Sequence, residues 1–232
     1  MKKLKYLRII ACIVIGMCLA SCEKEDEPEP KNPVEENLEI CTEQEVDLGL
    51  PSGTIWAGWN VGASSPEENG GYYAWGEIEE KDFYGYETYE YWDDLNGDGY
   101  WRYDEAVHLG MDISGTQYDV ARQKWGGDWR MPTKKEKDEL IWYCSWECCI
   151  YKDKKGCKVT GPNGKSIFLP AAGHKYEGDQ YIDIESGDYW SSSVEENCGN
   201  YLVNGFGFST YSCPFSSITD SRFLGYTVRP VK

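Results

Sequence analysis

Residues 94–105 have the composition and spacing of a calcium-binding loop. Calcium takes six to eight oxygen ligands, and a twelve-residue loop supplies them from positions 1, 3 and 5, a backbone carbonyl at position 7 and a bidentate glutamate at position 12. These positions hold Asp94, Asn96, Asp98, Tyr100 and Glu105, and a glycine at position 6 allows the sharp turn. The sequence therefore predicts a calcium site formed by these five residues.

Two features of the loop leave an alternative open. Arg102 stands at position 9, where a ligand usually acts through water, and a cation there weakens the attraction for calcium. The segment before Asp94 is rich in tyrosine rather than clearly helical, so the loop is more similar to a dockerin loop than to a paired EF-hand. The alternative is an acidic turn that binds no ion tightly.

Aromatic residues surround this loop. They are Tyr84, Tyr86, Tyr89, Tyr91, Trp92, Tyr100, Trp101 and Tyr103. Flat rings stack on sugars and are enriched in protein interfaces. This makes Tyr91, Trp92, Trp101 and Tyr103 candidate ligand-binding residues, and the alternative is that the rings form a small core of their own over a sheet.

The N-terminus has the pattern of a lipoprotein signal. Basic residues are followed by twelve apolar residues, Ile9–Ala20, and Leu19-Ala20-Ser21-Cys22 resembles a lipobox. Twelve residues are too few for a spanning helix, which needs about 20. We therefore expect 1–21 to be a signal peptide and Cys22 to carry diacylglycerol and an amide-linked fatty acid such as palmitate, which anchor the chain stably.

The chain is strongly acidic, with 40 Asp and Glu against 23 Lys and Arg and a net charge of −17. Loss of 1–21 removes four basic residues and no acid, which makes the charge −21. Nucleic acid needs clustered basic residues, so it is excluded as a partner. The acidic, proline-rich linker 22–44 either keeps the tether extended or resembles the export tag of Bacteroidota surface lipoproteins. We expect an outer-membrane, lipid-anchored protein exposed at the cell surface.

A single domain is expected from 45 to 232, with an insertion at about 78–115. Short runs with β-branched and aromatic residues predict strands. These are Val46–Leu50, Thr54–Val61, Gly71–Gly76, Cys157–Gly161, Ser166–Leu169, Tyr189–Val194, Tyr201–Phe208 and Phe223–Arg229. Pro162-Asn163-Gly164 predicts a hairpin between two of them.

Two helices are expected in the middle of the domain. The first begins near Thr116 and includes Trp125, and the second begins with a capping box at Thr133 and Glu136 and continues to Cys144. Sheets combined with two helices predict the α+β class.

Seven ordered blocks resemble the Fibrobacter succinogenes major paralogous domain family, over residues 45–231. The blocks are Val46–Ala57, Asn60–Ala63, Trp75–Glu77, Trp125–Thr133, Leu169–Gly173, Tyr189–Ser193 and Val228–Val231. The family is common among bacterial surface lipoproteins and is similar to the C-type-lectin-like fold shared with formylglycine-generating enzymes. The resemblance implies a C-type-lectin-like fold of mixed, mainly antiparallel sheets with two central helices.

The resemblance implies display and ligand binding rather than a defined activity. The chain lacks the Glu-Pro-Asn and Trp-Asn-Asp triplets with which lectins hold sugar through calcium. Only Cys198 and Cys213 lie where formylglycine-generating enzymes hold copper, and no matching motif surrounds them. Arg130, next to an aromatic cluster, is expected to be a buried or cation–π framework residue.

The cysteines and histidines give weaker indications of chemistry. Seven cysteines follow Cys22, so at least one is free or pairs between chains, and Cys198 with Cys213 and Cys144 with Cys157 are the pairs to test. The two histidines, His108 and His174, lie in no nucleophile or zinc motif.

The leading hypothesis is a surface-displayed lipoprotein with a non-enzymatic binding or adhesion domain, ordered by calcium, whose ligand is a glycan or a surface protein. One alternative is a carbohydrate-active or other hydrolytic enzyme, because 40 acidic residues hide any carboxylate pair. The other is a structural subunit of a surface assembly.

Overall fold

The computed structural model describes residues 38–93, 95, 97, 106–177, 185–195, 201–211 and 215–232. All of them belong to one compact unit, Pro33–Lys232. Cys22, the linker before residue 38 and the predicted ligands Asp94, Asn96, Asp98, Tyr100 and Glu105 lie outside the described residues.

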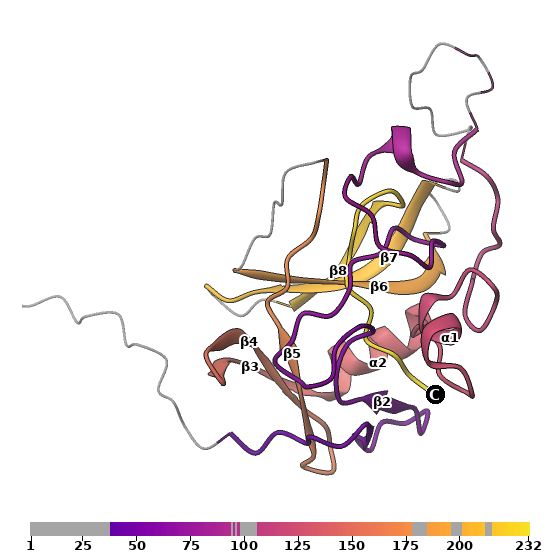
Figure 1. The fold of residues 1–232 in the computed structure, drawn as a ribbon. Helices are drawn as coiled ribbons and strands as arrows, with labels where there is room; N and C mark the ends of the chain where they lie inside the picture. The colour runs from indigo at the N-terminus through magenta and orange to yellow at the C-terminus, as the bar shows by residue number, and fades with distance from the viewer. Residues whose placement is uncertain are drawn as a thin grey trace, which may run out of the picture. The chain divides into compact units, whose positions relative to one another are not determined.

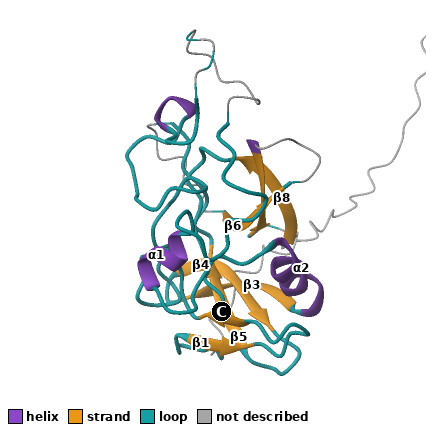
Figure 2. Ribbon diagram, turned by 90° about the vertical axis from the view of Figure 1, so that its right-hand side faces the viewer, coloured by secondary structure: helices purple, strands orange, loops and turns teal. Residues whose placement is uncertain are grey.

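Three antiparallel sheets form the framework of the described residues (Figures 1 and 2). The first pairs β1 (Glu45–Asp47) with β2 (Ile55–Ala57). The second has the order β3 (Ser145–Tyr151), β4 (Lys154–Thr160) and β5 (Ser166–Pro170). The third has the order β6 (Ser186–Val194), β7 (Leu202–Ser209) and β8 (Phe215–Ser221).

Two α-helices accompany the sheets: α1 (Val120–Trp125) and α2 (Lys134–Tyr143). A 3-10 turn covers Tyr86–Thr88. In Figure 1, α2 lies below the β6–β8 sheet, and it contacts all three strands of that sheet. The predicted α+β class, with mainly antiparallel sheets and two helices, is confirmed.

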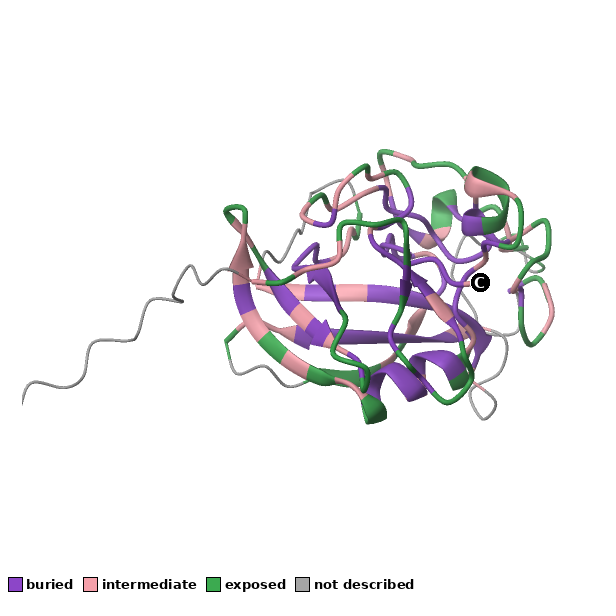
Figure 3. Cartoon of the chain, turned by 90° about the horizontal axis from the view of Figure 1, so that it is seen from below, coloured by how far each residue is buried: buried purple, intermediate pink, exposed green. Residues whose placement is uncertain are grey.

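The core consists of neighbouring apolar clusters. Leu140 and Ile141 of α2 pack with residues of β4, β5 and β7, and Trp190 packs with the residues around α1. Figure 3 shows the resulting pattern, with buried residues along much of the sheets and in the middle of α2 and exposed residues at the two ends of this helix. Burial of this apolar surface is what stabilises the fold.

The C-terminal segment contacts several parts of the fold without forming the strand predicted over Phe223–Arg229. It forms isolated bridges with several different segments instead, including Tyr226 with Tyr73 and Thr227 with Tyr189. A continuous ladder needs one partner over several residues, and this segment changes partner every one or two residues. The predicted strand is therefore wrong, although its residues are buried as a strand's would be.

The structure differs from the predicted secondary structure in three further places. Gly71–Gly76 contains only the bridge at Tyr73. Gly76 has a φ of +90°, which does not fit a regular strand. Strands β3 and β8 were not predicted, because β3 follows α2 after one residue and β8 is rich in serine and mostly exposed.

Candidate ligand-binding cleft beside helix α2

The start of α2 is held by a capping box and an ion pair. The Thr133 hydroxyl accepts from the Glu136 backbone N–H, and the Glu136 carboxylate accepts from the Thr133 backbone N–H at 2.9 Å. Arg130 donates to both oxygens of the same carboxylate, at 2.8 and 2.6 Å. Burial alone would raise the pKa of Glu136, but the bonds from Arg130 and Thr133 outweigh it and lower the pKa to about 2.

Arg130 is therefore a framework residue whose partner is a carboxylate. The prediction that it supports the structure is consistent with this geometry, although the contact is an ion pair with Glu136 rather than a cation–π contact. The pair fixes the first turn of α2, and so the direction in which the helix leaves the loop.

A buried lysine attaches the middle of α2 to strand β8. Lys137 is fully buried, and its ammonium group donates to the Ser217 hydroxyl at 2.5 Å. The same group lies 2.9 Å from Asp138 Oδ1, while Lys134 lies 3.2 Å from Asp138 Oδ2. Burial raises the pKa of Asp138, but these two lysines outweigh it, so the pKa is lowered and the carboxylate is charged.

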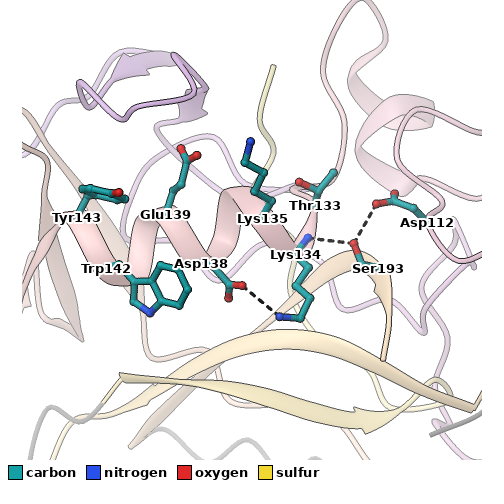
Figure 4. Close-up of a pocket in the computed structure, with 9 residues that line it drawn as sticks. All are labelled: Asp112, Thr133, Lys134, Lys135, Asp138, Glu139, Trp142, Tyr143 and Ser193. Atoms are coloured by element: carbon teal, nitrogen blue, oxygen red, sulfur yellow. Dashed lines mark hydrogen bonds and ion pairs between the residues drawn. The ribbon is translucent and has the colours of Figure 1, made fainter. Parts of the chain in front are cut away.

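An open cleft of about 510 Å³ lies beside α2. Figure 4 shows the side chains that line it: Asp112, Thr133, Lys134, Lys135, Asp138, Glu139, Trp142, Tyr143 and Ser193. In this view Lys134, Asp138 and Trp142 point toward the β6–β8 sheet, and Lys135, Glu139 and Tyr143 point to the opposite side of the helix. The cleft is thus lined mainly by one helix.

Two consecutive aromatic residues at the end of α2 are exposed to solvent. Trp142 is 75% exposed and Tyr143 is 53% exposed. Tryptophan is highly buried on average, so an exposed tryptophan beside a cleft is an informative departure. Rings of this kind supply large contact areas to sugars and proteins.

The other end of the cleft is fixed by polar contacts. The Ser193 hydroxyl accepts from the Lys134 backbone N–H and donates to Asp112 Oδ2, each at 2.9 Å. Asp112 and Ser193 also form a backbone bridge, which joins the C-terminal part of the insertion to the end of β6. Both ends of the cleft therefore belong to ordered elements, and its shape exists before any ligand binds.

Asp138 is held in its charged form and is suited to accept hydrogen bonds. Asp138 has a lowered pKa, whereas a general acid needs a raised one. The Ser193 hydroxyl donates to a carboxylate, and neither histidine lines the cleft. Asp119 does have a pKa raised by burial, but its carboxylate caps α1 and accepts backbone N–H groups from Gly115 and Met131, a structural role.

The two histidines lie elsewhere. The His174 ring contacts Asp188 Oδ2 at 3.0 Å, and His108 accepts from the Gly110 backbone N–H.

The predicted aromatic site residues are only partly described. Tyr91 and Trp92 are half-buried, with Tyr91 packed edge-on against Tyr89 and Tyr118, and Trp92 edge-on against Tyr86. Trp101 and Tyr103 lie outside the described residues.

Two other rings of the insertion are structural. Tyr84 and Tyr89 are buried and donate to the carbonyls of Tyr72 and Trp75, at 2.5 and 2.7 Å. Part of the aromatic segment therefore forms a local core.

The residues on either side of the predicted calcium loop lie together. Trp92 and Ala106 form an antiparallel bridge, and the Val107 N–H donates to the Tyr91 carbonyl at 2.8 Å. The flanks of the loop are therefore paired extended segments, and these positions do not carry the helices of an EF-hand.

The structure changes the expectation for one of the two cysteine pairs. Cys144 and Cys157 are both free thiols, as are Cys41 and Cys149. Cys148 is disulfide-bonded, even though the Cys157 sulfur lies only 3.5 Å away across β3 and β4. The pairing of Cys144 with Cys157 is therefore wrong, because both are free and Cys157 lies opposite Cys148 in the β3–β4 pair. Cys198 and Cys213 lie outside the described residues.

Sequence reasoning missed the α2 cleft. A signal was present, since Lys134, Asp138 and Trp142 recur every four residues and place a tryptophan on an otherwise charged helix face. Trp142 is adjacent to the core residue Ile141, and the sequence did not distinguish an exposed ring from a buried one.

No protein-family model, curated protein or solved structure matches the chain. In the described part of the chain, no helix is long and apolar enough to cross a membrane.

Proposed function

We propose that this chain is a surface-displayed lipoprotein whose folded domain binds a glycan or a surface protein without catalysing a reaction. The observation that carries this proposal is the open cleft beside α2 with Trp142 and Tyr143 exposed at one end. Leaving large rings in water forgoes the free energy of their burial, and a ligand that covers them recovers it. Charged groups already held in place by the protein give the cleft fixed donors and acceptors.

The anchor and the fold complete the proposal. Cys22 is the lipidation site, and the acidic linker up to residue 44 carries the domain away from the outer membrane. A C-type-lectin-like fold is supported by the mainly antiparallel sheets, the two helices and the pairing of early and late segments, as when the Ile55 N–H donates to the Lys232 carbonyl at 2.9 Å.

The central experiment compares two exposed aromatic residues. Trp142→Ala removes a ring that lines the cleft, and Tyr211→Ala removes one that is 82% exposed but does not line it. Both variants and the parent are tested for capture of immobilised glycans and of purified envelope proteins. We expect Trp142→Ala to weaken capture at least about tenfold, with an unchanged melting temperature, and Tyr211→Ala to behave as the parent. Equal capture by all three proteins would refute the role of the cleft.

The same assay separates binding from catalysis and from assembly. Analysis of a captured glycan for shortened products tests the hydrolase alternative, and turnover would overturn the non-enzymatic proposal. Stoichiometric co-purification with one envelope protein, unaffected by Trp142→Ala, would favour the structural-subunit alternative.

The anchor is tested separately. Labelling of cells with a palmitate analogue and protease treatment of intact cells are compared between the parent and Cys22→Ala. We expect the parent to be labelled and digested from outside, and Cys22→Ala to lose the label. A labelled but protease-resistant protein would contradict surface exposure.

We also propose that residues 94–105 bind calcium, through Asp94, Asn96, Asp98, the Tyr100 carbonyl and Glu105. The spacing of oxygen ligands supports this, and so does the bridge between Trp92 and Ala106, which brings the two flanks together. Calorimetry with calcium is expected to give a binding heat for the parent and for Asp153→Asn, an exposed carboxylate in a distant turn. Asp94→Ala is expected to lose that heat, and negligible heat in all three proteins would refute the site.

A further inference from the structure

Three side chains form a row on α2 at a spacing of four residues. They are Lys134, Asp138 and Trp142, which point to the same side of the helix (Figure 4). With a rise of 1.5 Å per residue, each step is about 6 Å and the row is about 12 Å long. A cation, an anion and a flat ring thus follow one another along the cleft.

Asp138 is an acceptor fixed by the protein itself. Lys134 engages Oδ2 at 3.2 Å, and the fully buried Lys137 engages Oδ1 at 2.9 Å. The side chain keeps 17% exposure, and each carboxylate oxygen can accept more than one hydrogen bond. Asp138 can therefore accept hydroxyl groups from a ligand without first losing rotational freedom, which lowers the entropic cost of binding.

The ring of Trp142 offers the complementary apolar surface. A pyranose has hydroxyl groups around its edge and a face of C–H groups, so it matches a ring next to a fixed carboxylate and an ammonium group. A hydroxyl group both donates and accepts, and it suits Asp138 and Lys134 at once. Trp142 is one helical turn from Asp138, so the face and the edge hydroxyls of a sugar chain meet these groups in order.

The charges around the cleft favour a neutral ligand. Lys134 and Lys135 line the cleft, and Lys137 lies behind it. These three lysines are matched by three carboxylates: Asp112, Asp138 and Glu139. An anionic glycan gains no local excess of positive charge here and meets a chain of net charge −17. A basic peptide is attracted by the chain as a whole but meets the lysines of the cleft.

We infer that the α2 cleft binds a neutral oligosaccharide, with Trp142 stacked on a sugar face and Asp138 and Lys134 bonded to its hydroxyl groups. This inference rests on the proposed function, since it names the ligand class of the same cleft. It requires no metal ion, so binding at α2 is independent of calcium at residues 94–105.

The test is a titration of the full chain with neutral gluco-, manno- and galacto-oligosaccharides, with oligogalacturonates of the same lengths and with a lysine-rich peptide. The readout is the indole N–H resonance of Trp142, assigned by its loss in Trp142→Phe, together with affinities from calorimetry. We expect at least one neutral series to shift this resonance, with an affinity unchanged by a calcium chelator.

Variants locate the contact. Asp138→Asn is expected to weaken neutral binding roughly tenfold or more, because a hydrogen bond to a charged acceptor is lost, whereas Asp153→Asn changes nothing. Lys134→Met provides a second variant on the exposed row should Asp138→Asn unfold.

The outcomes distinguish the two proposals. Tighter binding of the oligogalacturonates or of the peptide at Trp142 would overturn the inference and leave the proposed function intact. No shift with any probe would also overturn the inference, while the proposed function would still be decided by whether Trp142→Ala loses capture of envelope components.

Discussion

Arg130 and Glu136 are joined by two hydrogen bonds, and the same Glu136 carboxylate closes the capping box of α2 with Thr133. One acidic side chain therefore fixes both the loop before the helix and its first turn. Since this helix lines the candidate cleft and neither Arg130 nor Glu136 lines it, the pair positions the lining residues from behind.

The Glu136 pair is expected to make stability depend on acidity. The pKa of Glu136 is about 2 in the folded chain, against an ordinary value of 4.5, so the stabilisation is complete above pH 4.5 and is lost as pH falls toward 2. It amounts to about 3 kcal/mol, at 1.36 kcal/mol per pKa unit. Urea unfolding at pH 7 should show Glu136→Gln less stable by about this amount, with the difference shrinking between pH 4.5 and 2. Asp153→Asn is the control, and a difference independent of pH would contradict the ionic origin.

Lys137 is expected to fix the position of α2 on β8 and to contribute little to the free energy of unfolding. Burial lowers its pKa despite the attraction of Asp138, so the folded chain binds fewer protons than the unfolded chain just below pH 10.5, and this group makes stability rise with pH there. Lys137→Met keeps the volume and removes the buried charge, which should change stability by less than about 1 kcal/mol.

Lys137→Ala leaves a cavity and should cost about 3 kcal/mol. Unfolding of all three proteins at pH 7 and pH 10 checks both statements. The rise in stability between pH 7 and pH 10 that comes from Lys137 should disappear in Lys137→Met. If the methionine and alanine variants lost the same free energy of unfolding, the ion pair with Asp138 would be essential.

The turn between β3 and β4 offers a simple test of backbone strain. Lys152 and Asp153 have φ values of +47° and +63°, as a two-residue hairpin turn requires. Asp153→Gly should raise the free energy of unfolding by about 0.5 kcal/mol, because glycine adopts this conformation without steric cost.

The converse change is Gly164→Ala in the β4–β5 turn. Its φ is +86°, and an added Cβ would meet no atom within 4 Å, so only backbone strain is added and the expected loss of stability is about 1 kcal/mol. The midpoints of urea unfolding measure both effects, provided that the slopes are unchanged. If Asp153→Gly and Gly164→Ala were both stabilising, the argument from backbone strain would be refuted.

The free thiols should differ in reactivity. Burial raises the pKa of Cys144 and Cys157 to about 12 and that of Cys149 to about 11, and only the thiolate reacts readily. Alkylation of the native protein at pH 8, followed by non-reducing peptide mapping, should modify the half-buried Cys41 first. All four should react after denaturation, while Cys148 remains in a disulfide. A peptide joining Cys144 to Cys157 would contradict this arrangement.

Features decided by neighbours in sequence were predicted well. The capping box at Thr133 and Glu136 and the turn at Pro162-Asn163-Gly164 depend on hydrogen bonds within a few residues. Both are present, the latter with the Gly164 N–H donating to the Gly161 carbonyl. The predicted start of α2 was therefore correct, and its end differed by one residue from the last helical residue, Tyr143.

Features decided by distant partners were predicted poorly. Strand β8 has little apolar character, and it is a strand because β7 supplies a continuous set of partners from Leu202 to Phe208. The segment Phe223–Arg229 has the composition of a strand, yet Arg229 donates to Ala57 and Asn60 in one part of the chain and to Phe168 in another. Composition does not specify how many partners a segment meets.

The sequence by itself determined the acidic charge, the lipobox-like pattern that ends at Cys22, the spacing of oxygen-bearing side chains from Asp94 to Glu105 and the α+β class. Each depends on residue types or on short-range periodicity. Only the tertiary structure decided that Trp142 is exposed beside a cleft and that Asp138 is fixed there. The reason is physical, since Lys137 is held by Ser217, 80 residues further along the chain, and that contact exists only when α2 packs on β8.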